Sequence, residues 1–262
     1  AQCAWSPRCT KEWRDADHLS LVAFMRSDHR LALEAAGITT VRGLASADPG
    51  QPAPGLGSAS WERLHAQAAL QIKERDTQEP HYELLPTPDG RGLHALPARS
   101  RGDVYLDFEG DPYAEDGDGR EYLAGLWTRD GEYVTFWAHT YDEERALTAE
   151  LLADLAARAE ADPDMHIYHY APYEITALRR LTQRHEVGEI DLDRLLRSER
   201  FVDLYAVVRQ GLRISKESYS LKSLEAFYWG HERGKGGGDE VTSALDSVVE
   251  YERWLAEGKT DA

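Results

Sequence analysis

The chain has 262 residues, of which 42% are hydrophobic, with 7 tryptophans and 13 tyrosines. It is long enough to bury a sizeable core, which excludes a disordered protein and fits one main domain with smaller attachments. No apolar run reaches the roughly 18 to 20 residues that a membrane helix needs, and the first residues lack a secretion-signal pattern. We therefore expect a cytoplasmic protein without a membrane partner.

The net charge of −17 is unevenly distributed. Residues 1–75 carry 9 Lys and Arg against 8 Asp and Glu, and residues 76–102 carry 3 against 4, but residues 103–262 carry 18 against 35. A solvated acidic surface explains such an excess, and so do acidic side chains that hold divalent metals. The charge alone leaves both interpretations open.

The first part of the chain contains both cysteines, Cys3 and Cys9. Two neighbouring cysteines are too few for a disulfide framework and too local to staple a fold. Residues 32–73 read as short helices that are broken by Gly and Pro.

One of these breaks is Gly55-Leu56-Gly57, which precedes Ser58 at the start of a helix. It matches the turn of a helix-hairpin-helix module, with residues 38–44 as the preceding helix. Glycines let the backbone approach a ligand closely, and N–H groups at a helix start can hold a phosphate. An ordinary helix–helix turn is an equally good interpretation.

Residues 76–102 are rich in Pro and Gly and read as a linker. Beyond it, strand patterns at 104–108, 122–128 and 133–138 indicate a meander. A helical periodicity follows over 143–161, then a strand at 165–169 and a helix from 172 to about 183. With further helices over 205–210 and 220–228, this order predicts an α/β domain.

Asp107 and Glu109 lie two residues apart on the first strand of this domain, so both side chains leave the same face of the sheet. Two neighbouring carboxylates repel each other unless a cation neutralises them. Two-metal nucleases hold Mg²⁺ or Mn²⁺ with such a pair. Asp-x-Glu is also typical of surface charge, but the apolar residues around it favour a metal site, because acids at the end of a core strand are costly without a partner.

Four segments carry a resemblance to a known family. They are Val104–Glu109, His166–Glu174, Val202–Tyr205 and Ser218–Lys222. Their order resembles that of exonucleases with four metal-binding acids, and most of all the ribonuclease-H-like domain of bacterial RecB-like nucleases, over residues 103–255. The resemblance implies a ribonuclease-H-like mixed sheet with flanking helices over 103–262, after the linker at 76–102. It also implies a small all-α, helix-hairpin-helix-like region at 28–75 and the tail of an upstream RecB-like nuclease domain at 1–27.

The same resemblance implies a set of site residues. Asp107, Glu109 and Glu174 are expected to be catalytic and, with Asp203, to hold two Mg²⁺ or Mn²⁺ ions. Glu174 stands where such exonucleases usually have Asp, which lengthens the side chain. Asp203 fits the family's next element, although a helix N-cap explains it equally well.

The last motif of the family, Tyr-Asn-x-x-Asp, is not in this sequence, because Tyr251 is followed by Glu252. We therefore expect an interior piece of a longer protein, with weak or no activity. At the other end, Cys3 and Cys9 resemble part of the C-x2-C-x5-C cluster that holds a [4Fe–4S] centre in RecB-like nucleases. Two thiols cannot retain such a cluster, so we expect free cysteines here and the centre only in the full-length protein.

Other polar side chains are candidates for nucleic-acid contacts. Lys222 is expected to contact phosphate or cap a helix, and it joins Gly55, Gly57 and Ser58 as a candidate for binding. His166, His169 and the tyrosines at 168, 170 and 173 could stack on a base or assist a metal, although such residues more often line a core or a pocket. We predict no catalytic histidine.

The resemblance implies metal-dependent phosphodiester hydrolysis, as a 3′→5′ exonuclease on DNA that is single-stranded or has a free end. The implied partners are a fused RecB-like nuclease domain and a helicase. Two alternatives remain open. One is a non-catalytic module that binds nucleic acid for a fused enzyme, and the other is a structural scaffold, which would bind no divalent metal.

Overall fold

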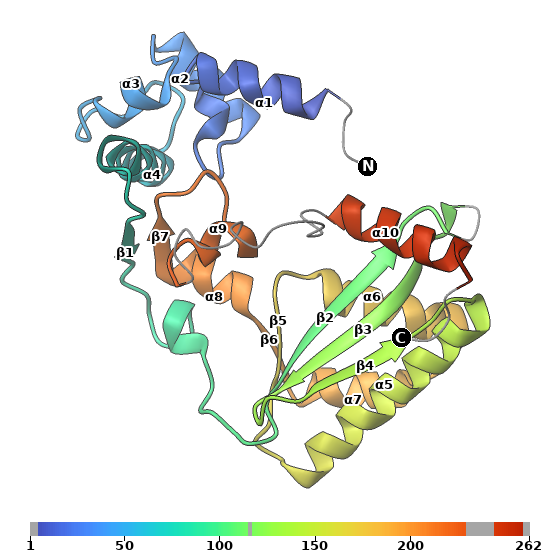
Figure 1. Ribbon diagram of the computed structural model, residues 1–262. Coiled ribbons are helices and arrows are strands. Elements are labelled where there is room, and N and C mark those ends of the chain that lie inside the picture. The colour runs from blue at the N-terminus through green and yellow to red at the C-terminus, as the bar shows by residue number, and fades with distance from the viewer. Residues whose placement is uncertain (1–4, 115–116, 229–243, 259–262) are drawn as a thin grey trace. The chain divides into compact units, whose positions relative to one another are not determined.

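The computed structural model describes residues 5–114, 117–228 and 244–258. The chain divides into two compact units (Figure 1). Unit 1 combines Ala1–Leu93 with Val208–Arg233, and unit 2 combines His94–Val207 with Gly234–Ala262. Among the described residues, no helix is long and apolar enough to cross a membrane.

Unit 1 is mainly helical, as expected for the N-terminal region. Its helices are α1 (Ser6–Asp15), α2 (Ser27–Ala35), α3 (Val41–Ala45) and α4 (Ser58–Thr77), with a 3-10 turn, η1, at Leu19–Leu21. Apolar side chains from these elements form a core around Trp61 and Leu64 of α4. The amides of Gln67 and Gln71 on α4 are buried in this unit and bond to backbone groups, so that neither leaves a polar atom without a partner.

A small sheet joins two distant stretches of unit 1. Strand β1 (Tyr82–Leu84) pairs antiparallel with β7 (Leu212–Ile214). The 3-10 turn η2 (Gly92–Ala95) follows β1, and the helices α8 (Leu204–Gly211) and α9 (Leu221–Glu225) flank β7. The range 76–102, which was expected to be a linker, thus contains a strand. With three residues, this strand is too short for an alternating pattern to reveal it in the sequence.

Unit 2 contains a five-stranded mixed sheet with the strand order β4-β3-β2-β5-β6. The strands are β2 (Val104–Asp111), β3 (Arg120–Thr128), β4 (Tyr133–Trp137), β5 (Ile167–His169) and β6 (Phe201–Asp203). The first three form an antiparallel meander, and β5 and β6 continue the sheet in parallel with β2. This arrangement confirms the predicted α/β mixed sheet with flanking helices.

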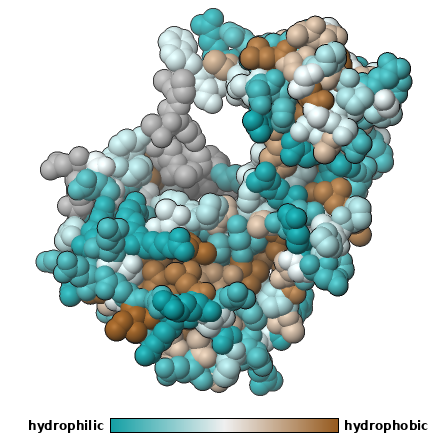
Figure 2. Space-filling view, turned by 180° about the vertical axis from the view of Figure 1, so that it is seen from behind, coloured by the Kyte–Doolittle hydropathy of each residue, from teal (hydrophilic) through white to brown (hydrophobic). Residues whose placement is uncertain are grey.

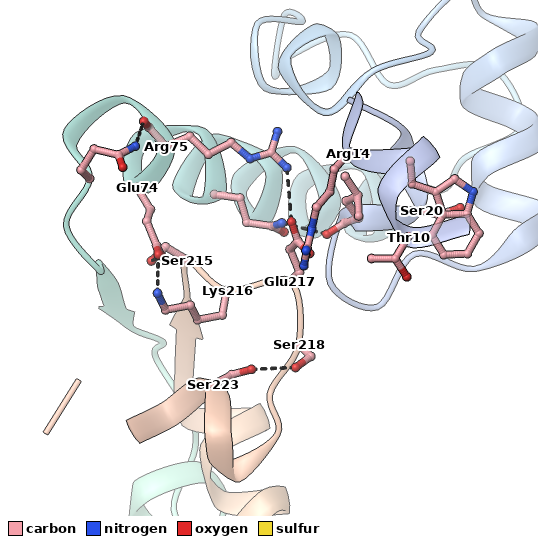
Figure 3. Close-up of a pocket in the computed structure, with 14 residues that line it drawn as sticks. Thr10, Arg14, Ser20, Glu74, Arg75, Ser215, Lys216, Glu217, Ser218 and Ser223 are labelled. Carbon is pink, nitrogen blue, oxygen red and sulfur yellow. Dashed lines mark hydrogen bonds and ion pairs between the residues drawn. The ribbon is translucent and has the colours of Figure 1, made fainter. Parts of the chain in front are cut away.

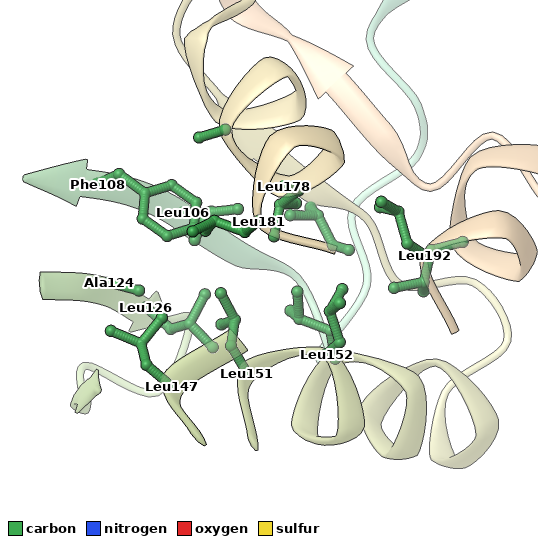
Figure 4. Close-up of a cluster of buried hydrophobic side chains, with 14 of the residues drawn as sticks. Leu106, Phe108, Ala124, Leu126, Leu147, Leu151, Leu152, Leu178, Leu181 and Leu192 are labelled. Carbon is green, nitrogen blue, oxygen red and sulfur yellow. The ribbon is translucent and has the colours of Figure 1, made fainter. Parts of the chain in front are cut away.

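Alternation along β2 separates the two faces of the sheet. Val104, Leu106 and Phe108 are buried, whereas Tyr105 and Asp107 are exposed. The buried side chains pack with leucines of the helices α5 (Tyr141–Ala161), α6 (Tyr173–His185) and α7 (Glu189–Arg197) (Figure 4). Each buried Leu or Phe contributes about 1.5–3 kcal/mol. Asp107 therefore stands on the face opposite to this core.

The meander is closed by a three-residue loop. Thr128 and Glu132 are bonded through their backbones on either side of it, and Gly131 has a φ of +87°. A glycine in the left-handed region is typical of this hairpin class, and it fixes the register between β3 and β4. One face of the meander therefore presents Tyr105 and Asp107 of β2 beside Trp127 and Gly125 of β3, with Tyr133 of β4 next to Trp127.

Helix α10 (Ala244–Ala256) lies across the end of β2 (Figure 1). Its Tyr251 stacks on Tyr122 of β3, with ring centroids 3.8 Å apart. On the side of the molecule seen in Figure 2, hydrophobic residues gather in the middle of unit 2, the larger body, and hydrophilic residues surround them. Unit 2 therefore exposes hydrophobic residues on its surface in addition to those that it buries between the sheet and the helices.

Candidate functional site

The two carboxylates of β2 share the outward face of the sheet, as their spacing predicts. In the register between β2 and β3, Asp107 lies opposite Gly125. A side chain at position 125 would collide with the Tyr133 hydroxyl, so the absence of one lets the phenol lie over the strand. Burial raises the pKa of Tyr133, and the charges of Asp107 and Glu109 raise it further. A phenol thus lies beside the carboxylate pair.

Helix α10 brings a hydroxyl to the second carboxylate. The Ser247 hydroxyl donates to Oε2 of Glu109 at 3.4 Å and lies 2.7 Å from the Tyr122 hydroxyl. The register between β2 and β3 shifts directly after Glu109, at Gly110. Such a bulge bends a strand and re-aims its side chains, and bulges are frequent next to active sites.

Glu174, in the first turn of α6, is the most deeply buried of the candidate ligands. It is 4% exposed, and its Oε2 lies 3.4 Å from Nδ1 of His169, which is 3% exposed. The same Nδ1 lies 2.7 Å from the Ala171 carbonyl oxygen. Glu174 Oε2 has no hydrogen-bond partner among the described residues beyond its 3.4 Å contact with His169 Nδ1, and His169 Nε2 has none there at all. Buried polar atoms without partners are rare and call for an explanation.

The charges of this region act on one another. Asp107 is open to solvent on one side but crowded on the other, so that burial and the charge of Glu174 both raise the pKa of its carboxyl. Burial alone would lower the pKa of His169, but the Glu174 carboxylate and the Ala171 carbonyl together raise it above its ordinary value. The fold thus holds Asp107 and Glu174 close enough to repel each other.

Asp203, at the end of β6, has a different environment. Its Oδ1 accepts hydrogen bonds from the backbone N–H groups of Ala171, Tyr205 and Ala206 at 2.9–3.2 Å. Two of these lie at the start of α8, and the third belongs to a residue with a φ of +72° in the loop before α6. This oxygen therefore fixes backbone, and the helix-capping interpretation of Asp203 describes its observed contacts.

Asp107, Glu109 and Glu174 are the donors that unit 2 offers to a divalent cation near its outward face. Among the described residues, no group of three or more His, Cys, Asp or Glu is gathered tightly enough to hold a metal ion. The repulsion between Asp107 and Glu174 and the unpartnered oxygen of Glu174 are nevertheless what a cation would relieve, and carboxylate oxygens are the donors that Mg²⁺ and Mn²⁺ prefer. Asp107 and Glu174 are therefore the two carboxylates beside which such an ion would fit.

The remaining predicted residues lie in unit 1. Cys3 is outside the described residues, and Cys9 is a free, half-buried thiol in α1. Gly57 is the N-cap residue of α4, and Gly55 has a φ of +87°. Residues 46–57 separate α3 from α4, which is longer than a tight hairpin, and Lys222 is exposed on α9.

Unit 1 also contains a cavity of about 650 Å³, between α1, α4 and residues 215–223 (Figure 3). Its cationic side chains face carboxylates: Arg14 and Arg75 lie 3.2 and 3.7 Å from Glu217, and Lys216 forms an ion pair with Glu74. Arg75 also forms an ion pair with Asp17, so each of the three cations already has a carboxylate partner. None of the three is left unpaired for a phosphate.

Sequence reasoning missed a buried ionic network in unit 2. Glu144 of α5 is fully buried and accepts hydrogen bonds from the Glu121 backbone N–H, from Arg184 and from His185. The Glu121 carboxylate accepts from the Tyr173 hydroxyl and forms an ion pair with Arg180. A signal was present, because Glu144 falls on the apolar face of α5, where an acid needs a buried partner.

One of three comparisons with known proteins found a match, and it agrees with the fold of unit 2. No curated protein and no solved structure matches the chain. The model of the RNase H superfamily matches residues 104–262, which is more than half of the chain and begins at the first residue of β2. The chain therefore belongs to the RNase H superfamily.

Proposed function

We propose that this chain hydrolyses phosphodiester bonds of DNA with the help of divalent metal ions, as a 3′→5′ exonuclease. Membership of the RNase H superfamily indicates nuclease-type chemistry. The observation that carries the metal-dependent reading is Glu174, a buried carboxylate whose Oε2 lacks a hydrogen-bond partner among the described residues. Beside the His169 imidazole at 3.4 Å, a divalent cation would complete the partners of this buried charge, and Asp107 would share it.

Asp107, Glu109 and Glu174 would hold Mg²⁺ or Mn²⁺. When bound, such ions polarise the phosphoryl group and lower the pKa of a water molecule. The Ser247 hydroxyl orients Glu109, and Asp203 and His169 both hold the loop that leads into α6. Asp203 and His169 therefore set the position of Glu174.

The exonuclease polarity, the DNA substrate, and the fusion to a RecB-like nuclease and a helicase are supported by the order of the four sequence segments alone. A module that binds nucleic acid without cleaving it would keep the same fold and much of the same surface. Such a module would not need carboxylates that can bind a metal. Metal binding is therefore the property that separates the two functions most directly.

Calorimetric titration with Mn²⁺ tests the proposal. The wild-type chain is expected to bind Mn²⁺, Asp107→Asn to bind it much more weakly, and Glu150→Gln, which alters an exposed acid of α5, to bind it as the wild type does. A 5′-labelled single strand, incubated with Mn²⁺, should shorten one nucleotide at a time from its 3′ end. Equal Mn²⁺ affinity of wild type and Asp107→Asn would overturn the assignment.

A further inference from the structure

A row of aromatic side chains crosses the outward face of the sheet in unit 2. Tyr105 of β2 pairs in register with Trp127 of β3 on one side and with Tyr168 of β5 on the other. Trp127 in turn pairs with Tyr133 of β4. The order across four neighbouring strands is therefore Tyr133, Trp127, Tyr105 and Tyr168, which we call the aromatic row.

Three of the four rings of the aromatic row, those of Tyr133, Trp127 and Tyr105, are open to solvent, whereas Tyr168 is buried. Tyr105 stacks on Tyr168 with centroids 5.2 Å apart, and Trp127 lies 6.3 Å from Tyr133. Tyr133, Trp127 and Tyr105 are 58%, 50% and 47% exposed. Cross-strand aromatic pairs stabilise a sheet, but this role alone does not require half of each side chain to face water. A contiguous exposed patch of this kind marks a binding surface.

The aromatic row borders the candidate carboxylates. Asp107 is two residues beyond Tyr105 on the same face, which is a separation of about 6.6–6.8 Å along a strand. The Tyr133 phenol lies over Gly125, the residue opposite Asp107. A linear polymer with one end at Asp107 could therefore extend over the aromatic row.

Arginines lie at the other side of the aromatic row. Burial raises the pKa of the Tyr168 phenol, and the nearby guanidinium groups of Arg99 and Arg129 oppose that rise, which shows that both lie close to this ring. Arg129 donates to the Ser100 carbonyl at 2.9 Å, which holds it at the edge of the sheet. Arg99, Arg101 and Arg129 are all exposed.

We propose that the aromatic row binds single-stranded nucleic acid, with bases stacked on Tyr105 and Trp127 and phosphates at Arg99 and Arg129. The expected direction of the strand, with its reacting end toward Asp107, rests on the proposed function. Stacking needs unpaired bases, which a duplex does not offer.

The test is the affinity for a fluorescently labelled deoxythymidine oligonucleotide, measured by anisotropy at low salt in EDTA, where no metal-dependent cleavage occurs. Trp127→Ala is expected to raise the Kd by about 5- to 150-fold, which corresponds to the loss of one stacked base. Trp127→Phe keeps a ring and should retain most of the affinity. The control is Trp5→Ala, which removes a 64% exposed tryptophan from unit 1 and should leave the Kd unchanged. Circular dichroism checks that each variant is folded.

Three results would overturn the proposal. The first is an unchanged Kd for folded Trp127→Ala, and the second is tighter binding of a duplex than of the single strand. The third is a shift of oligomeric state in Trp127→Ala without a change in oligonucleotide affinity, since a second copy would then cover the row. Because the assay contains no metal, oligonucleotide binding by a wild type that fails to bind Mn²⁺ would leave this inference intact and reject the nuclease.

Discussion

Unit 2 buries two sets of carboxylates that differ in their partners. Glu144 is fully buried and accepts hydrogen bonds from a backbone N–H, an arginine and a histidine. Glu174 is nearly as buried, but among the residues that the structure describes its Oε2 has only a 3.4 Å contact with His169, and the nearby charge of Asp107 repels it. Burial alone therefore does not distinguish a structural acid from a candidate ligand. The two kinds of acid differ in whether their carboxylate oxygens have a full set of hydrogen-bond partners.

The difference has an energetic meaning. A buried acid with complete partners stabilises the fold in its ionised form, and removing it leaves its partners unsatisfied. A buried acid without complete partners lowers stability until a cation arrives, so removing it should cost function and little stability. The following variants test this contrast, from the largest expected effect to the smallest.

Glu109→Gln should lower the rate of Mn²⁺-dependent cleavage about a thousandfold, because a bound metal supplies several kcal/mol of transition-state stabilisation and each 1.4 kcal/mol is a factor of ten. The amide can still accept the hydrogen bond from Ser247, so the fold should be retained. Single-turnover cleavage of a labelled single strand measures the rate. A rate close to that of the wild type would remove Glu109 from the site.

Glu144→Ala should lower the free energy of unfolding by about 3–5 kcal/mol, because it leaves the half-buried Arg184 and the buried His185 without their carboxylate. Urea denaturation measures the loss. Glu150→Ala changes an exposed acid of the same helix and should stay within about 0.5 kcal/mol of the wild type. Similar losses in the two variants would contradict the network as a source of stability.

Mn²⁺ at a hundred times its Kd should raise the free energy of unfolding of the wild type by about 2.7 kcal/mol, since it binds only the folded chain. Glu174→Gln should lose most of this gain, because the neutral amide no longer attracts the cation. Urea denaturation with and without Mn²⁺ gives both values. A full gain in Glu174→Gln would show that the ion binds elsewhere.

Without metal, Asp107→Asn should be slightly more stable than the wild type at neutral pH. Burial and the charge of Glu174 raise the pKa of Asp107 in the folded state, so ionisation of Asp107 opposes folding. The protonated acid has no such effect. The advantage of the variant should therefore vanish below the ordinary pKa of 3.8 and grow as the pH rises through the raised value. Thermal unfolding across this range measures it, and a variant less stable at neutral pH would contradict the repulsion.

Much of the sheet could be predicted from local patterns. The alternation of residues 104–108 gave β2 and put Asp107 on the outward face, and Gly131 marked the turn between β3 and β4. Helix α7 and strand β6 were not predicted. Glu186 ends α6 in a left-handed conformation, and α7 begins at Glu189, so the gap between the two helices is too short to show in the sequence.

The site was less predictable than the fold. The spacing of Asp107 and Glu109 placed them on one face, but only tertiary structure shows that Oδ1 of Asp203 is occupied by backbone N–H groups. The contact between Ser247 and Glu109 likewise joins residues far apart in the chain. The aromatic row was within reach of the sequence, because the short β3–β4 turn sets the register that pairs Trp127 with Tyr133.

The pairing of β1 with β7 constrains the order in which the protein assembles. During synthesis the helices of residues 5–77 emerge first, yet Gln67 of α4 bonds to the Ile214 carbonyl and to the Tyr219 hydroxyl, which emerge only after residues 94–207. The closure of so long a loop is slow unless the intervening chain is already compact. Unit 1 should therefore be completed late, and a nascent chain that stops before β7 should be the form most open to proteases and chaperones.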